Sequence, residues 1–235
     1  MKKLIAALGL IFLSSLNLSY AEGFGINVTR IVFQEYFDST TVTLRNTSTN
    51  QAYVVQARMS QTIDGFEDTP FIVTPPIFRL DPDTTNNLRI KLDKKSVLPV
   101  DRESIFYLNT RAIPSSMQNS YKGDSKKISG VAQFGVGTII KLFYRPKGLA
   151  SSPEDAQRKI KFSKSANEMH VRNNSPYFIS FASLKIDGKS LIKKNTPAML
   201  EPYSEYFYPT EIKHGKITWS TINDFGGINE YTSSF

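Results

Sequence analysis

Side chains that commonly carry enzyme chemistry are few in this sequence, and they are scattered. Its two histidines, His170 and His214, stand apart from any serine-elbow, phosphate-loop or metal-ligand motif. Asp81 and Asp83 flank a proline, a pattern typical of a turn. Cysteine is absent, which excludes thiol nucleophiles, thiolate metal sites and disulfides. We therefore expect no catalytic, metal or cofactor site and no enzyme activity.

The most informative stretch is VAQFGVGTIIKLFYRP, residues 131–146. Its first half alternates, so that one strand face carries Ala132, Phe134 and Val136, and the other only Gln133, Gly135 and Gly137. Two interpretations remain open from the residues alone. The stretch is either an internal strand that fills a sandwich core, or an edge strand that lends its apolar row to a partner. Glycine favours close approach of another backbone.

Period-2 alternation dominates the rest of the chain and indicates a β-sandwich. The expected strands of a first unit cover residues 24–33, 41–45, 53–59, 88–92 and 104–109, followed by residues 131–146. Prolines and a glycine in residues 146–153 indicate a boundary. We predict a first domain over residues 22–146 and a second over residues 147–235.

The second unit is again predicted to be built from strands, with one helical turn at most over residues 154–158. Strands are expected around residues 160–162, 169–171 and 178–184. Asp187-Gly188 predicts a tight hairpin turn. The segment of residues 216–222, which contains the single tryptophan, is expected to close the unit.

The N-terminus has the three parts of a secretory signal peptide: Lys2 and Lys3, an apolar core over residues 4–13, and the small-x-small end Ser19-Tyr20-Ala21. This small-x-small end predicts cleavage after Ala21. The apolar core is too short for a membrane-spanning helix, which needs about 20 apolar residues. The formal charge is +8, of which the two leader lysines supply two. We expect an exported, soluble protein that neither inserts into a membrane nor binds nucleic acid.

Four segments in this order are distinctive: Thr74-Pro75-Pro76, residues 101–109 (DRESIFYLN), residues 140–146 (IKLFYRP) and residues 222–227 (INDFGG). Together they resemble the periplasmic pilus (fimbrial) assembly chaperones of the chaperone–usher pathway, over almost the whole mature chain. The resemblance implies two immunoglobulin-like β-sandwich domains in a boomerang arrangement with an interdomain cleft. It also implies a periplasmic chaperone that binds, folds and caps pilus subunits by donor-strand complementation and delivers them to an outer-membrane usher.

The resemblance assigns three groups of site residues. Arg30 and Lys141 match the basic pair that anchors the subunit's C-terminal carboxylate, through charge-assisted hydrogen bonds worth about 1.5–3 kcal/mol each. Ala132, Phe134 and Val136 match the donor residues, and Ile140 is expected to extend that row. Glu103, Arg145 and Asp224 match an interdomain charge triad with an architectural role.

Two other functions agree with part of the sequence. A pilus subunit or surface adhesin would also be exported and β-rich, but two predicted domains and the absence of cysteine argue against it. A periplasmic hydrolase lacks a catalytic cluster. Within the family, the long loop after Ile113 and the missing cysteine pair point to different branches, and the short-loop branch is favoured. An exposed donor edge also invites self-association of the free protein.

Overall fold

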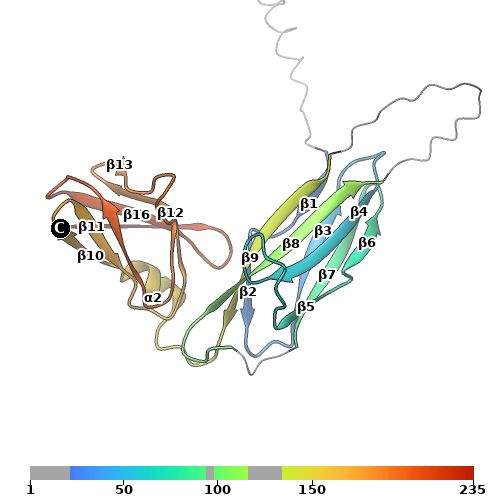
Figure 1. Cartoon of the computed structure of the whole chain (residues 1–235), viewed down its shortest axis with the longest axis horizontal. Coiled ribbons are helices and arrows are strands. Elements are labelled where there is room, and N and C mark those ends of the chain that lie inside the picture. The colour runs from blue at the N-terminus through green and yellow to red at the C-terminus, as the bar shows by residue number, and fades with distance from the viewer. Residues whose placement is uncertain (1–21, 94–97, 116–133) are drawn as a thin grey trace, which may run out of the picture.

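A computed structural model of the chain describes residues 22–93, 98–115 and 134–235. Two β-sandwiches follow each other along the chain and are set at an angle, so that the molecule is bent (Figure 1). This arrangement confirms the prediction of two sandwich domains. The predicted signal peptide and the donor-strand residue Ala132 lie outside the described residues.

The N-terminal sandwich packs a four-stranded sheet, in the order β1-β3-β7-β5, against a five-stranded sheet, in the order β2-β9-β8-β4-β6. The strands of the first sheet are β1 (Phe24–Ile26), β3 (Ser39–Asn46), β7 (Thr84–Leu92) and β5 (Phe71–Thr74). The strands of the second are β2 (Arg30–Gln34), β9 (Val136–Arg145), β8 (Ser104–Pro114), β4 (Tyr53–Ser60) and β6 (Ile77–Leu80). Alternate residues of each strand fill the core between the sheets, among them Phe33, Leu44, Leu88 and Leu142.

The first predicted strand, residues 24–33, is wrong as a single strand. β1 pairs with β3 in one sheet, whereas β2 pairs with β9 in the other. Between them the chain crosses from sheet to sheet, and the side chain and backbone of Asn27 hold the crossing by hydrogen bonds to Thr43. The crossing gives β9 a parallel neighbour that begins only at Arg30.

The C-terminal sandwich begins with helix α2 (Pro153–Arg158), whose N-cap Ser152 accepts a hydrogen bond from the Asp155 N–H. One sheet contains β10 (Lys161–Ser165), β11 (Glu168–Arg172) and β15 (Glu205–Pro209). The other contains β13 (Lys189–Ser190), β12 (Ile179–Ile186), β16 (Lys216–Ile222) and β17 (Ile228–Ser234), with β14 (Met199–Leu200) paired to β12. Its core includes Met169, Leu184, Tyr208 and Trp219.

Of two local predictions in this domain, one is confirmed and one is wrong. Asp187 and Gly188 both have positive φ and form the tight turn from β12 to β13, as predicted. The expectation that residues 216–222 close the unit is wrong, because β17 follows β16 and pairs with it along seven residues. Among the described residues, no helix is long and apolar enough to cross a membrane.

Candidate functional site

Arg30 and Lys141 are brought together by the parallel pairing of β2 with β9, in which they are direct partners. Arg30 extends toward the C-terminal domain, where its Nη1 donates a hydrogen bond of 2.8 Å to the Ile222 carbonyl. Its guanidinium also lies 5.5 Å from the centre of the Phe143 ring. The Arg30 Nε is buried and makes no hydrogen bond to the described part of the chain. Arg30 therefore keeps unused donor capacity at the junction of the domains.

Lys141 is half-buried beside Arg30, with its Nζ 3.5 Å from Met199 Sδ on β14 of the C-terminal domain. Within the described residues it forms no ion pair. Burial lowers the pKa of Lys141, and the neighbouring charge of Arg30 lowers it further. Two adjacent cations, one without a counter-charge, would be stabilised by an anion that reaches both. The predicted anchor pair thus has the proximity and the electrostatics that carboxylate binding needs.

The predicted charge triad is formed across the two domains. Arg145, at the end of β9, donates from Nε to Glu103 Oε1 at 2.8 Å. Its Nη1 and Nη2 donate to the two carboxylate oxygens of Asp224 at 2.6 and 2.8 Å, a bidentate pair. Asp224 lies in the turn between β16 and β17, so this contact joins the C-terminal domain to β9.

Glu103 adds a second link between the domains, because its Oε2 accepts a hydrogen bond of 2.9 Å from the Phe178 N–H. Burial raises the pKa of the Glu103 carboxyl, against the opposing effects of Arg145 and the Phe178 N–H. Burial alone would lower the pKa of Arg145, but its hydrogen bonds and charge contacts with Asp224 and Glu103 raise it overall. The triad is saturated with internal partners, which favours an architectural role.

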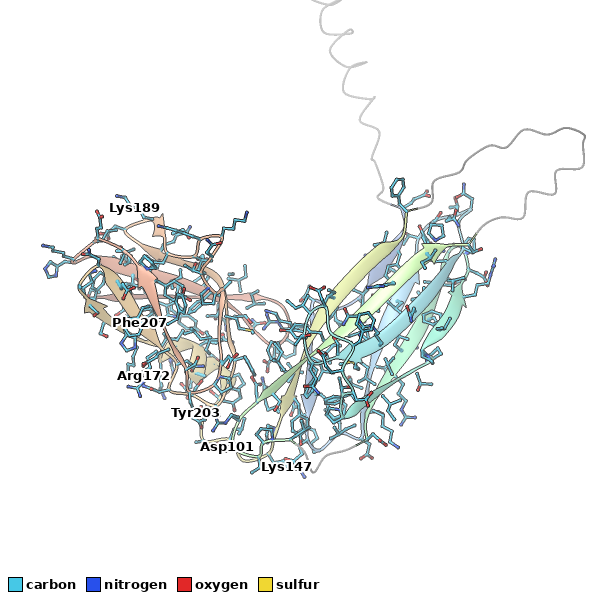
Figure 2. All side chains as sticks on the ribbon, viewed as in Figure 1. Asp101, Lys147, Arg172, Lys189, Tyr203 and Phe207 are labelled. Atoms are coloured by element: carbon cyan, nitrogen blue, oxygen red, sulfur yellow. The ribbon has the colours of Figure 1, made fainter. Side chains whose placement is uncertain are left out.

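A further contact between the domains lies on the outer side of the bend, where Figure 2 places Asp101 next to Tyr203. The Arg102 guanidinium lies 5.1 Å from the centre of the Tyr203 ring, and the Tyr203 hydroxyl is 3.5 Å from the Asp101 carbonyl. Sequence reasoning missed this contact. The only hint in the sequence is that Arg102 directly precedes Glu103 of the predicted triad, and this position does not reveal that Arg102 contacts an aromatic ring.

β9 has a free edge in its first half. It pairs with β8 from Val136 to Tyr144, but with β2 only from Lys141 to Arg145. In the described structure, the backbone of Val136–Ile140 therefore has no strand on its second side. This unpaired edge begins directly next to the Arg30–Lys141 pair.

Of the predicted donor residues, Val136 and Ile140 lie on the core-facing side of β9 and Phe134 directly precedes the strand, but their surroundings differ. Phe134, just before β9, is 83% exposed, and Val136 is 46% exposed. Ile140 is 6% exposed and packs in the core of its own domain with Leu142 and Tyr144. Since Ile140 is already buried in its own domain, it is not available to a partner in this structure, which argues against the expectation that it extends the donor row. Along β9, the core-facing side chains thus change from buried at Ile140 to exposed at Val136.

Gly135 and Gly137 lie on the other face of this segment, where glycine was expected to allow close approach of a partner's backbone. A Cβ atom at Gly135 would lie 3.3 Å from the Ala112 carbonyl oxygen of β8, within the same domain. At Gly137 the nearest atom, the Thr110 carbonyl oxygen, would be 3.9 Å away, an ordinary contact. Close approach is therefore made by the neighbouring strand at Gly135, and Gly137 shows none.

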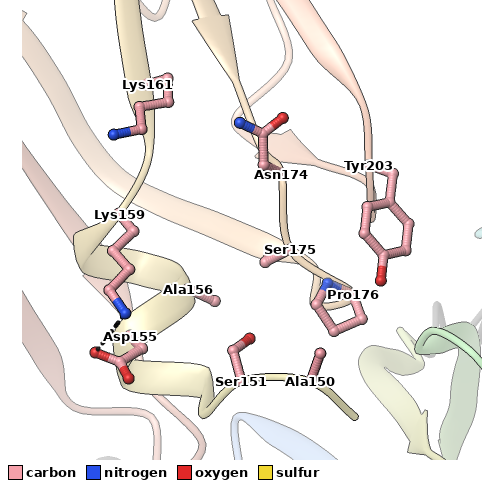
Figure 3. Close-up of a pocket in the computed structure, with 10 residues that line it drawn as sticks. All are labelled: Ala150, Ser151, Asp155, Ala156, Lys159, Lys161, Asn174, Ser175, Pro176 and Tyr203. Atoms are coloured by element: carbon pink, nitrogen blue, oxygen red, sulfur yellow. Dashed lines mark ion pairs between the residues drawn. The ribbon is translucent and has the colours of Figure 1, made fainter.

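A hollow of about 460 Å³ lies in the C-terminal domain between α2, the Asn174–Pro176 segment and Tyr203 (Figure 3). Asp155 at its rim is engaged by Lys159, at 3.6 Å, and by Arg158. None of the predicted site residues lines this hollow. The hollow is thus separate from the anchor pair and the donor edge.

His170 belongs to a surface cluster that the sequence did not reveal. Its Nε2 is 2.9 Å from Glu205 Oε2 and its Nδ1 3.2 Å from Ser163 Oγ, across β10, β11 and β15. The ring stacks on Phe207 at 4.4 Å. The strand register brings Ser163, His170 and Phe207 into one row and places Glu205 two positions along β15, opposite Arg172, so only the pairing of the three strands could have predicted the cluster.

Residues 23–150 match the family described as "Pili and flagellar-assembly chaperone, PapD N-terminal domain". Residues 155–233 match "Pili assembly chaperone PapD, C-terminal domain". These two matches cover most of the chain in the order that the two sandwiches have. The chain belongs to the pilus-assembly chaperone family, and its two domains are immunoglobulin-like.

Individual relatives agree with this assignment. The chain is 37% identical to the probable fimbrial chaperone protein ElfD of Escherichia coli (strain K12), over 87% of this chain and 83% of that protein. It is 33% identical to the chaperone protein FimC of the same strain, over 93% of this chain and 87% of that protein.

Solved structures share the fold. The periplasmic chaperone SfaE matches with a TM-score of 0.73 and 30% identity, over 90% of this chain and 98% of that one. The E. coli chaperone DraB matches with a TM-score of 0.75 and 28% identity, over 91% and 99%. Both of these structures are of chaperones.

Proposed function

We propose that this chain captures pilus subunits in the periplasm through two coupled contacts. The C-terminal carboxylate of the subunit binds Arg30 and Lys141, and an adjacent subunit strand pairs with the free edge of β9. The observation that carries the proposal is the place where β2 begins. Because β2 starts at Arg30, the unpaired edge of β9 and the cation pair meet at one point.

The geometry also defines a direction for the bound strand. A strand that continues the line of β2 beyond Arg30 would run parallel to β9 along Val136–Ile140, about 16 Å at 3.3 Å per residue. Its last residue would then meet Arg30 and Lys141. A strand running the opposite way would place its carboxylate far from the cations. The anchor therefore selects a strand parallel to β9 and sets its register.

Register decides which side chains enter the subunit. Phe134 and Val136 lie on one face and are exposed, so they can fill the gap in an incomplete subunit sandwich, with Ala132 proposed as the next member of the row. A slip by one residue would turn Phe134 and Val136 away from the subunit core. Main-chain hydrogen bonds would supply affinity, and the two apolar side chains would supply fit.

Substitution of Lys141 by Met tests the anchor, because it removes the charge while keeping a long side chain. Arg30 is less suitable, since its loss also removes the hydrogen bond to Ile222. Periplasmic co-purification followed by mass spectrometry should recover pilus subunits with the wild-type chain and at least about tenfold less with Lys141→Met, given the worth of a charge-assisted hydrogen bond.

The matched control is Lys185→Met, since Lys185 is an exposed lysine on β12. It should retain the wild-type yield of subunit. Recovery of subunit with Lys141→Met in wild-type amounts, from a chain of unchanged melting temperature, would contradict the anchor. Absence of any pilus subunit from the wild-type sample would contradict the proposed function as a whole.

The remaining partners follow from the same proposal. Delivery to an outer-membrane usher needs a surface that a bound subunit leaves open. Val54 and Ile113 are cross-strand partners on β4 and β8, and with Ile77 of β6 they form an exposed apolar group away from the edge of β9. We assign usher contact to this group. In the absence of subunit, the free edge of β9 would pair with a second copy of the chain.

Export by a signal peptide cleaved after Ala21 is part of the same proposal, since subunit capture takes place in the periplasm. The proposed domain bounds are residues 22–146 and 147–235. They are supported by the end of β9 at Arg145 and the start of α2 at Pro153, which leave a short linker between the sandwiches.

A further inference from the structure

Among the methionines that the structure describes, Met199 is distinguished by its contact with Lys141. Its Sδ lies 3.5 Å from the Lys141 Nζ, across the junction of the domains. Met59 and Met169 are buried in the cores of the two sandwiches, whereas Met199 is half-buried on the short strand β14. A thioether is only a weak hydrogen-bond acceptor, so Met199 packs against the ammonium without satisfying it.

We propose that Met199 is an oxidation site through which peroxide controls the Lys141 anchor. The inference rests on the proposed function, since it concerns the same lysine. Hydrogen peroxide transfers one oxygen to the thioether: a sulfur electron pair forms the S–O bond, the O–O bond breaks, and the departing hydroxide takes a proton to leave as water. Met199 is oxidised by two electrons and the peroxide is reduced.

The sulfoxide differs from the thioether in its strength as a hydrogen-bond acceptor. A sulfoxide oxygen is a strong acceptor on a polar group, and it is attached to an atom already within 3.5 Å of the Lys141 Nζ. Lys141 has no ion pair in the described structure, and its ammonium is partly desolvated beside Arg30. The new oxygen would accept a hydrogen bond from the Lys141 ammonium and compete with the subunit carboxylate for it.

The consequence is a reversible loss of subunit capture under oxidising conditions. Methionine sulfoxide is returned to the thioether by methionine sulfoxide reductases, so the anchor would recover. The donor edge of β9 is not altered by the reaction. The effect is therefore confined to the carboxylate contact, and we expect a roughly tenfold weaker affinity for a strand that ends in a free carboxylate, the worth of one charge-assisted hydrogen bond.

The first experiment needs no subunit. The mature wild-type chain and Met199→Leu are treated with hydrogen peroxide, and acylation of Lys141 by an N-hydroxysuccinimide ester is followed by mass spectrometry, with Lys185 as the internal reference. Oxidation should slow acylation of Lys141 several-fold in the wild type and leave Met199→Leu and Lys185 unchanged. Equal rates before and after oxidation of Met199 would overturn the inference.

The second experiment separates this inference from the proposed function. A peptide that copies the C-terminal strand of a co-purifying subunit is titrated as the free acid and as the C-terminal amide. If the reduced chain does not prefer the free acid, the proposed anchor fails, whatever the acylation result. If it does, peroxide should reduce that preference about tenfold in the wild type only, and reductase should restore it. A preference of unchanged size after oxidation of Met199 would overturn the inference.

Discussion

One face of β9 carries Lys141, Phe143 and Arg145, and all three side chains contact the C-terminal domain. Their surroundings nevertheless give them different roles. Arg145 has two carboxylates and three hydrogen bonds of at most 2.8 Å. Phe143 packs on Phe178, with ring centres 5.6 Å apart. Lys141 has a thioether and another cation nearby. Arg145 and Phe143 therefore join the domains, whereas Lys141 is proposed to bind a ligand.

Substitution Glu103→Gln tests the balance inside the triad. Because burial raises the pKa of Glu103 above its ordinary value of 4.5, the folded chain holds this proton more tightly than the unfolded chain. The contribution of Glu103 to the free energy of unfolding is then most favourable below pH 4.5 and falls as pH rises through the folded-state pKa. Glutamine does not titrate, so this fall should be absent from the variant.

The measurement is the difference in melting temperature between Glu103→Gln and the wild type at pH values from about 4 to about 7, the range in which a raised carboxyl pKa acts. The variant should be destabilised more at the acid end than at neutral pH, since all other titrating groups are common to both chains. A variant whose relative stability falls with rising pH would mean that the attraction of Arg145 outweighs the burial of Glu103.

At the scale of an element, β9 combines three tasks along ten residues. Its last residues join the domains, its middle carries the proposed anchor Lys141, and its first half presents an unpaired edge. The core-facing row runs from Tyr144, Leu142 and Ile140, which are buried, to Val136, which is not. One strand therefore fills the core of its own domain at one end and is proposed to fill that of a subunit at the other.

Two substitutions on β9 separate the faces of this strand. Val136 and Ile139 are 46% and 44% exposed and lie on opposite faces. Val136→Asp would place a carboxylate in the subunit core and should weaken capture at least about tenfold, since an unpaired charge is costly in apolar surroundings. Ile139→Asp should leave capture near the wild-type level. The ratio of subunit co-purified with the two variants is the measurement, and equal losses would mean that the facing is wrong.

The elements that the sequence predicted well are those with a strict period of two and one buried face, such as β16, whose bounds match residues 216–222. β17 was missed because its residues are mostly polar and exposed, which is typical of an edge strand. The crossing at Asn27 was missed because the apolar pattern continues through it. For Ile140 the pattern gave the correct face, but only the packed structure shows where the core ends along the strand.

Some site residues could be predicted from the sequence, whereas contacts between the two domains could not. Composition alone excluded thiol chemistry, and the resemblance to pilus chaperones supplied Arg30, Lys141 and the triad. The contact of Lys141 with Met199 joins residues 58 positions apart. No local pattern encodes such a contact, because it depends on how the two domains are placed against each other.

At the scale of the whole molecule, the bend is held by contacts on both sides of the junction. The triad and the hydrogen bond from Arg30 to Ile222 lie near the turn between β16 and β17, and the Arg102–Tyr203 contact lies on the outer side. In that turn Gly226 has a φ of 82°, and a Cβ atom there would overlap the Thr29 hydroxyl of the N-terminal domain. The absence of a side chain at Gly226 therefore lets the turn lie close to Thr29, which precedes the proposed anchor Arg30.

Gly226→Ala should accordingly change the angle between the domains as well as the stability. The positive φ costs about 1–2 kcal/mol for a residue with a Cβ, and the overlap with Thr29 adds a displacement of the turn. Gly188→Ala is the matched control, because Gly188 has a φ of 79° but nothing within 4 Å of the added Cβ. Small-angle scattering should differ from the wild type for Gly226→Ala only, whereas both variants should melt at lower temperature.

The double variant Thr29→Ala, Gly226→Ala completes the test, since removal of the Thr29 hydroxyl leaves room for the new methyl group. It should regain the wild-type scattering profile while keeping the loss of stability that Gly188→Ala also shows. Because Thr29 precedes Arg30 directly, subunit capture should fall with Gly226→Ala and return in the double variant. A scattering profile that stays wild-type in Gly226→Ala would mean that the turn at Gly226 does not set the bend.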